Sequence, residues 1–214
     1  LKNPRGKRVL VRVDFNVPVD HGKVADDMRI RAAVPTIRWL VKKGAKVVLM
    51  SHFGRPKSKR ELRIKNLSAD RQDEELRIVA KRLSELLKKK VQMVEEWPAH
   101  PPLREGGDQS GKAGGVLMLP NLRLHPGEEA NDPAFARELA ALAQIYVNEA
   151  FSVCHRKHAS VVGVPEFLPS YAGLRLEEEV KVLSGLLRHP RRPLVVMIGG
   201  AKITDKIGVI HEFL

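Results

Sequence analysis

Basic side chains recur directly after short apolar runs in this chain. The positions that follow these runs, with the polar residues beside them, are Arg12, Asp14 and Asn16; Ser51, His52 and Arg55; Asn121, Arg123 and His125; His155, Arg156 and His158; and Gly199, Gly200, Ala201 and Lys202. A guanidinium group binds carboxylate or phosphate through two parallel hydrogen bonds, and several such groups together hold a small anion with more than one charge. The chemistry that these residue types favour is anion binding.

The apolar runs predict buried strands, because they are short, rich in β-branched residues and, in several cases, apolar on both faces. The predicted strands are residues 8–13, 45–50, 91–94, 115–119, 145–148 and 194–198. Amphipathic stretches alternate with them, and the predicted helices are residues 36–43, 73–89, 132–143 and 176–188. Parallel neighbouring strands need crossover helices, so this order predicts an α/β fold: an open, mostly parallel wound sheet with flanking helices in three layers.

Proline and glycine residues mark the boundaries of these elements. Pro35 either opens the first helix or lies inside a helix that begins near Arg29, and Gly44 ends it. The pattern breaks at residues 165–173, and the prolines of residues 189–193 precede a new strand. The predicted organisation is a first domain over residues 1–172, a connecting helix over 173–190 and the start of a second, similar domain over 191–214. Because the chain opens on Leu and closes inside an apolar pattern, we expect a fragment at both ends.

The carboxyl ends of parallel strands share one edge of a sheet, where ligands bind in open α/β folds. For any single loop, a charge in water is the ordinary interpretation. Five strand ends that deliver basic residues to one edge favour a shared anion pocket instead. Asp14 and Asn16 are either turn residues or groups that hydrogen-bond a substrate and orient the arginines. In residues 51–56, Gly54 permits a tight turn and Pro56 stiffens it, which directs His52 and Arg55 toward the strand end.

Two glycine-containing segments suggest phosphate binding, and the sequence favours only one of them. Residues 199–202 follow an apolar strand and precede a helical pattern, so backbone amides, a helix start and Lys202 with Lys206 favour a phosphate cradle. Residues 106–113 nearly match a phosphate-binding loop, but Ala113 stands where Mg²⁺ needs a hydroxyl and no strand precedes the segment. No G-x-G-x-x-G segment occurs, which disfavours a dinucleotide-dependent dehydrogenase.

Composition leaves two classes of partner open. The 214 residues include 38 Lys and Arg against 25 Asp and Glu, a net charge of +13, which suits either nucleic acid or small anions. Only two Trp and two Tyr are present, too few for the aromatic surfaces of single-strand binders. A basic nucleic-acid-binding module and a non-catalytic anion-binding domain remain the alternatives to an enzyme.

The single cysteine favours a reducing compartment, and no apolar stretch is long enough to cross a membrane.

Several longer motifs, taken together and in this order, resemble the phosphoglycerate kinase family. They are residues 12–18 (RVDFNVP), 29–30 with 35–37, 51–56 (SHFGRP), 121–123 with 125–129, 150–151, 155–156 with 158–160, and 199–202 with 205–206. The resemblance covers essentially the whole chain. It implies the amino-terminal domain that binds 3-phosphoglycerate, the interdomain helix and the first part of the nucleotide-binding domain.

The resemblance also implies roles for individual residues. The residues expected to contact 3-phosphoglycerate are Arg12, Asp14, Asn16, Arg29, His52, Arg55, Arg123 and Arg156. Arg29 and Lys202 would act in catalysis, Arg29 by stabilising the phosphoryl group in transfer, and Gly200, Lys202 and Lys206 would contact the nucleotide. The implied reaction moves a phosphoryl group reversibly between 1,3-bisphosphoglycerate with ADP and 3-phosphoglycerate with ATP, in a cytoplasmic monomer without nucleic-acid or membrane partners. Mg²⁺ would accompany ATP or ADP, held mostly outside this chain, and we expect no metal ligands among these residues.

Four departures from the family pattern concern the loops near the interdomain region. Glu149 stands where the family has Asp, residues 152–154 (SVC) replace Gly-Thr-Ala, Pro120 replaces Glu and Leu124 replaces an aromatic residue. None of them removes an Arg, His or Lys from the expected site. They bear on the geometry of these loops and leave the expected substrate class unchanged.

Overall fold

The computed structural model describes residues 1, 3–54, 69–94, 97, 115–188, 190–197 and 208. The chain divides into two compact units, residues 1–176 and residues 177–214. The first unit holds a six-stranded sheet and the helices around it. The second contains most of helix α6 (Leu174–Arg188), none of whose residues is buried.

All six strands of the main sheet run parallel. They are β1 (Arg8–Arg12), β4 (Lys46–Met50), β5 (Val91–Met93), β6 (Val116–Met118), β7 (Ile145–Asn148) and β8 (Ser170–Ala172), in the order β5-β6-β4-β1-β7-β8. The expected α/β fold with a parallel wound sheet is therefore confirmed. A separate two-stranded hairpin is formed by β2 (Val19–Asp20) and β3 (Lys23–Val24).

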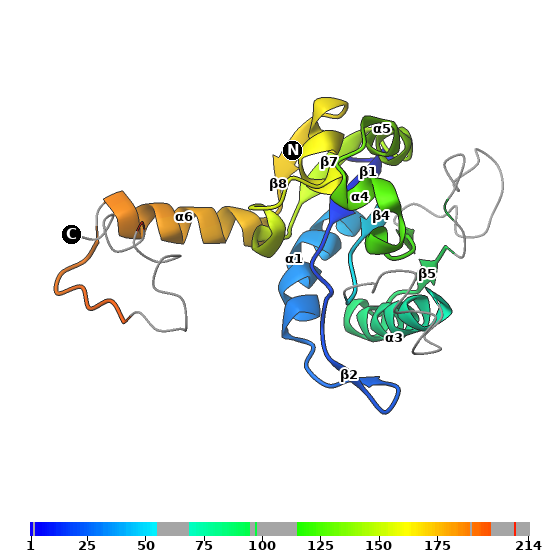
Figure 1. The fold of residues 1–214 in the computed structure, drawn as a ribbon, viewed down its shortest axis with the longest axis horizontal. Helices are drawn as coiled ribbons and strands as arrows, with labels where there is room; N and C mark the ends of the chain where they lie inside the picture. Colours follow the sequence, from blue (N-terminus) through cyan, green and yellow to red (C-terminus); the bar gives the residue numbers. More distant parts are fainter. Residues whose placement is uncertain are drawn as a thin grey trace. The chain divides into compact units, whose positions relative to one another are not determined.

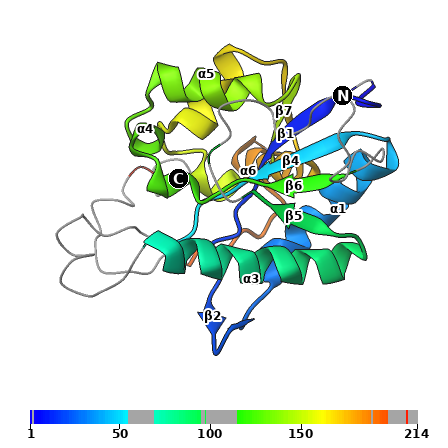
Figure 2. The same cartoon turned by 90° about the vertical axis from the view of Figure 1, so that its right-hand side faces the viewer.

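Helices cover both faces of the sheet. Helices α1 (Met28–Lys42) and α3 (Ala69–Leu87) lie on one face, and α4 (Pro126–Glu129) and α5 (Pro133–Ala141) lie on the other (Figure 1, Figure 2). Alternate residues of β1 enter the two cores: Val9 and Val11 pack with Ile37 of α1, whereas Leu10 packs with Leu139 of α5. This alternation is the two-residue period of a strand, and it explains why the strand sequences are apolar on both faces.

The strand register aligns the carboxyl ends at one edge. Arg12, the last residue of β1, is paired with Met50 of β4 and with Asn148 of β7, and Leu49 is paired with Met118 of β6. The segments that follow these strands therefore begin side by side. They contain short turns: η1 (Leu122–Leu124), η2 (Phe151–Val153), η3 (Ala159–Gly163) and η4 (Val164–Glu166).

The structure settles the position of the first helix and corrects one predicted strand. Helix α1 begins at Met28 and contains Pro35, so the proline lies inside the helix and removes one helical hydrogen bond. Residues 194–197 of the predicted strand 194–198 are not in a strand, because the described part of the second unit offers no neighbouring strand to pair with. Residue 198 lies outside the described residues. Strand β8 and the β2–β3 hairpin were not predicted, since both are short and no residue of β8 is buried. Among the described residues, no helix is long and apolar enough to span a membrane.

Candidate functional site

Arg12 and His52 form the buried centre of the site at the carboxyl edge of the sheet. The Arg12 guanidinium donates from Nη2 to Nδ1 of His52 at 3.1 Å and from Nε to Ser160 Oγ at 2.9 Å. Its third nitrogen, Nη1, donates to the carbonyl of Val13. Arginine has no acceptor, so Nδ1 of His52 must accept, and the proton of the neutral imidazole resides on Nε2.

The environment of His52 shows that three arginines lie within electrostatic reach of this imidazole. Burial, together with the positive charges of Arg12, Arg123 and Arg156, lowers the pKa of His52 to about 3, although Asp14 opposes the shift. His52 is therefore neutral at physiological pH. It offers an N–H donor to a ligand without adding a charge.

Asp14 brings Arg29 from helix α1 to the end of β1. One carboxylate oxygen, Oδ2, accepts from Arg29 Nη1 at 2.6 Å and from Ser152 Oγ at 2.5 Å. The other oxygen, Oδ1, accepts from the backbone amide of Asn16 at 3.1 Å and lies 4.0 Å from Nε2 of His52. The Asp14 carboxylate therefore fixes the position of Arg29 relative to the buried centre.

Two asparagines connect the loop after β4 to its neighbours. Asn16 accepts through Oδ1 from the amide of Gly54 at 2.9 Å, and Gly54 has a φ of 60°, which favours glycine. Asn121 accepts through Oδ1 from the amides of Phe53 and Arg123 at 3.0 and 3.1 Å. Its Nδ2 donates back to the Phe53 carbonyl at 2.8 Å, and Arg123 Nη1 donates to the carbonyl of Gly54. These bonds hold Arg123 beside the His52 loop.

Glu149, the first residue after β7, joins three segments at the same edge. Its Oε1 accepts from Thr36 Oγ1 of α1 at 2.8 Å and from the backbone amide of Arg175 in α6 at 3.1 Å. Thr36 Oγ1 in turn accepts from the amide of Leu174 at 2.9 Å. A Cβ on Gly173 would lie 1.5 Å from Glu149 Oε2, so this close approach requires glycine. Burial raises the pKa of the Glu149 carboxyl to about 7, although its hydrogen bonds with Thr36 and Arg175 oppose the shift.

The structure brings together most of the residues that the sequence indicated. The gathered residues are Arg12, Asp14, Asn16, Arg29, His52, Arg123 and Arg156. Arg55, Gly200, Lys202 and Lys206 lie outside the described residues. His125 stacks on Phe135 with ring centroids 3.7 Å apart and accepts from the Gly127 amide, so it serves the start of α4 and not the cluster.

Sequence reasoning assigned no role at the site to four polar residues that support this cluster. They are Glu128, Glu149, Ser152 and Ser160. The position of Glu149 directly after a strand was a usable signal, since the basic residues were found by the same rule. The two serines carried no such signal, because their partners lie far away in sequence.

The cluster is suited to a small anion with two charged groups. Arg12, Arg123 and Arg156 provide positive charge around one neutral donor, and Arg156 Nε is buried with no hydrogen-bond partner in the described part of the chain. A carboxylate and a phosphate could each engage such donors. The described residues contain no group of three His, Cys, Asp or Glu side chains placed to hold a metal ion.

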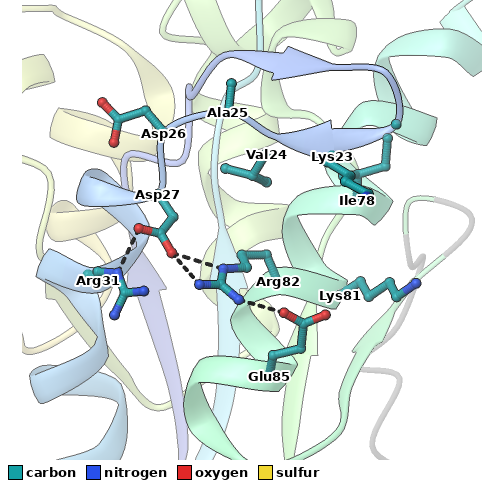
Figure 3. A pocket seen from close by; sticks show the side chains of 11 residues that line it. Lys23, Val24, Ala25, Asp26, Asp27, Arg31, Ile78, Lys81, Arg82 and Glu85 are labelled. Carbon is teal, nitrogen blue, oxygen red and sulfur yellow. Dashed lines mark hydrogen bonds and ion pairs between the residues drawn. The ribbon is translucent and has the colours of Figure 1, made fainter.

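A pocket beside the β2–β3 hairpin has a different character. It has a volume of ≈ 580 Å³, and four of the charged groups that line it pair with one another: Asp27, Arg31, Arg82 and Glu85. Asp27 accepts from Arg31 Nε at 2.6 Å and from two nitrogens of Arg82 at 2.7 and 2.9 Å, and Arg82 reaches Glu85 at 2.7 Å (Figure 3). In the cluster, Arg29 and Arg123 also have carboxylate partners, Asp14 at 2.6 Å and Glu129 at 3.4 Å. The cluster is still the stronger candidate for binding an anion, because it adds the buried Arg156 Nε, which has no hydrogen-bond partner in the described part of the chain.

Comparison with known proteins shows the family of the chain. A family model described as phosphoglycerate kinase matches residues 2–214. The chain belongs to the phosphoglycerate kinase family. Phosphoglycerate kinase of Thermosynechococcus vestitus is 50% identical over 213 residues, which cover 98% of this chain and 50% of that protein. The phosphoglycerate kinase of Dictyoglomus turgidum is 48% identical over 210 residues, with the same coverage.

Solved structures of phosphoglycerate kinases share the fold. The structure from Coxiella burnetii matches with a TM-score of 0.80 and 34% identity, over 98% of this chain and 49% of that one. The structure from Pyrococcus horikoshii matches with a TM-score of 0.77 and 30% identity, over 98% and 50%. The chain therefore spans about half the length of the phosphoglycerate kinases that it matches.

Proposed function

We propose that this chain is the 3-phosphoglycerate-binding half of a phosphoglycerate kinase. The observation that carries the proposal is the gathering of three arginines around the neutral His52 imidazole, with Arg29 held beside them by Asp14. A phosphorylated hydroxy acid carries a phosphate and a carboxylate, and this cluster offers donors and charge for both. Neither inorganic phosphate nor a simple carboxylate would use all of these groups at once.

Each part of the cluster has a distinct role in this proposal. Arg12, Arg123 and Arg156 neutralise the anion, and His52 donates from Nε2 without becoming charged. Arg29 is only partly covered, with a side chain that is 53% exposed, so it can reach a phosphoryl group at the mouth of the site. In phosphoryl transfer the protein contributes mainly position and charge neutralisation, which this arrangement supplies.

The second substrate would bind elsewhere on the protein. We assign Gly200, Lys202 and Lys206 to ATP or ADP on family resemblance, with residues 1–172 as the first domain, 173–190 as the connecting helix and 191–214 as the start of the nucleotide-binding domain. Mg²⁺ would enter with the nucleotide. Among the described residues, the Asp14 carboxylate is already bonded to Arg29 and Ser152, so it does not fit a metal. We further propose a cytoplasmic monomer without nucleic-acid or membrane partners.

A titration of backbone amide resonances with 3-phosphoglycerate tests the binding proposal on this chain. We expect saturable shifts at Asn16, His52 and Arg123, and none around Asp27 and Arg82, whose pocket serves as the internal control. Shifts spread over the surface lysines would contradict the proposal. So would a DNA duplex that binds the same residues and loses affinity steeply with salt, because that result identifies a nucleic-acid-binding module.

A further inference from the structure

Beneath the candidate site lies a buried polar chain whose far end has no assigned function. It runs from Glu128 of α4 through Ser160 of η3 to Arg12 of β1 and then to His52. Glu128 and Ser160 are 0% exposed and Arg12 is 1% exposed, so water cannot satisfy these groups. Every polar atom in such a chain needs a protein partner.

The hydrogen bonds of this chain have only one consistent direction. Arg12 Nε can only donate, so Ser160 Oγ accepts from it at 2.9 Å. A hydroxyl has a single proton, and Ser160 must therefore donate it to Oε1 of Glu128, at 2.5 Å. The backbone amide of Ser160 donates to the other oxygen of Glu128 at 2.9 Å, which fixes the carboxylate at both oxygens.

Charge supports the same arrangement. Burial lowers the pKa of Arg12, and the negative charge of Glu128 is the largest effect that opposes this. Glu128 therefore stabilises the charge of a guanidinium that is 1% exposed to solvent. Two other titratable groups lie near this carboxylate: His158, whose Nδ1 is 3.7 Å from Glu128 Oε1, and Tyr146, whose hydroxyl donates to the Ser160 carbonyl at 2.8 Å.

We infer that Glu128, acting through Ser160, is a positioning residue: it orients Arg12 so that Arg12 donates to Nδ1 of His52 and fixes the Nε2–H tautomer. The ligand side of the site then meets a single, predetermined donor. Glu128 itself does not touch the ligand, because two residues stand between it and the His52 ring. The benefit to ligand affinity rests on the proposed function, whereas the effect on the tautomer does not.

The test reads the tautomer of His52 from its ring ¹⁵N resonances, without ligand, at pH 7.5. His52→Gln assigns the signals. In the unmodified chain we expect one protonated ring nitrogen, Nε2. Glu128→Gln and Ser160→Ala should move both ring nitrogens toward averaged shifts, whereas Ser160→Thr, which keeps the hydroxyl, and Glu138→Gln on the exposed face of α5 should leave them unchanged. A single Nε2–H tautomer in both folded Glu128→Gln and Ser160→Ala variants would overturn the inference.

A measurement on the unmodified chain covers the case in which a variant does not fold. We expect the Nε–H proton of Arg12 to exchange with water at least about tenfold more slowly than that of Arg31, because both donate a hydrogen bond but Arg12 is 1% exposed whereas the Arg31 side chain is 58% exposed. Equal exchange rates would overturn the inference.

In the folded variants the affinity for 3-phosphoglycerate should fall about tenfold. If the unmodified chain does not bind 3-phosphoglycerate, the proposed function fails while the tautomer result stands independently.

Discussion

Two groups of arginines and carboxylates in this molecule have similar hydrogen-bond lengths and very different surroundings. Beneath the site, Arg12, Ser160 and Glu128 are joined at 2.9 and 2.5 Å and are all but inaccessible to water. Beside the hairpin, Arg82 and Asp27 are joined at 2.7 Å, with side chains that are 33% and 19% exposed. Burial, and not bond length, should decide how much each group contributes to the free energy of unfolding. Water screens the charges of an exposed pair, whereas it cannot solvate a charge that is left alone in a buried group.

The largest effect is expected from breaking the buried group. Arg12 and Glu128 are bridged by Ser160, and Arg12→Met leaves the buried carboxylate without the positive charge that compensates it, a change that costs about 3–5 kcal/mol in buried ion pairs. Urea unfolding at pH 7 measures the loss. The double variant Arg12→Met with Glu128→Gln should recover part of the loss, because the uncompensated charge is gone. A loss below about 1 kcal/mol for Arg12→Met would show that the burial of this group does not govern its contribution.

The next effect comes from Glu149 and depends on pH. Its pKa is about 7 in the folded chain against an ordinary value of 4.5, so the folded chain retains a proton that the unfolded chain releases. The free energy of unfolding should therefore fall as pH rises from about 4.5 to about 7, by about 3 kcal/mol in total, and stay level above that. Glu149→Gln should remove this contribution, so the variant gains stability relative to the unmodified chain between pH 5 and pH 8.

Urea unfolding of both proteins at pH 5 and pH 8 isolates the Glu149 contribution as a difference. Glu138→Gln, on the exposed face of α5, is the matched control and should parallel the unmodified chain. A difference between Glu149→Gln and the unmodified chain that is the same at both pH values would mean that Glu149 ionises normally.

A smaller effect is expected at Asn121, which is buried but uncharged. Asn121→Ala leaves the amides of Phe53 and Arg123 without their acceptor, and unsatisfied buried groups of this kind cost about 2 kcal/mol. Urea unfolding again gives the value. Asn121→Ser, which keeps an acceptor oxygen at this N-cap, should lose less, and an equal loss in both variants would exclude the acceptor as the cause.

The smallest effect is expected in the exposed pocket. Asp27→Asn weakens the bonds to Arg31 and Arg82, but water solvates the arginines that remain. The melting temperature should change by less than about 3 °C, and the change should shrink further in 1 M salt. A loss of stability as large as that of Arg12→Met would show that the exposed pocket and the buried group do not differ in their contribution.

The sequence predicted the parts of the site that depend on strand geometry. The sequence indicated Arg12, His52 and Arg123 because they follow β-branched runs. Parallel strands align their carboxyl ends at one edge of the sheet, independently of the other parts of the fold. Glu128 and Ser160 were missed for the opposite reason. They lie 32 residues apart in two short turns, α4 and η3, and only the packing of these turns places them together. Strand β8 escaped prediction because three exposed residues carry no apolar alternation.

A calorimetric titration of this chain with three ligands tests the central claim most directly: 3-phosphoglycerate, glycerol 3-phosphate without the carboxylate, and glycerate without the phosphate. The account predicts one binding site for 3-phosphoglycerate and affinities at least about tenfold weaker for the other two, since each lacks one charged group that the arginines engage. Equal affinities for 3-phosphoglycerate and glycerol 3-phosphate, or no binding of 3-phosphoglycerate at all, would contradict it.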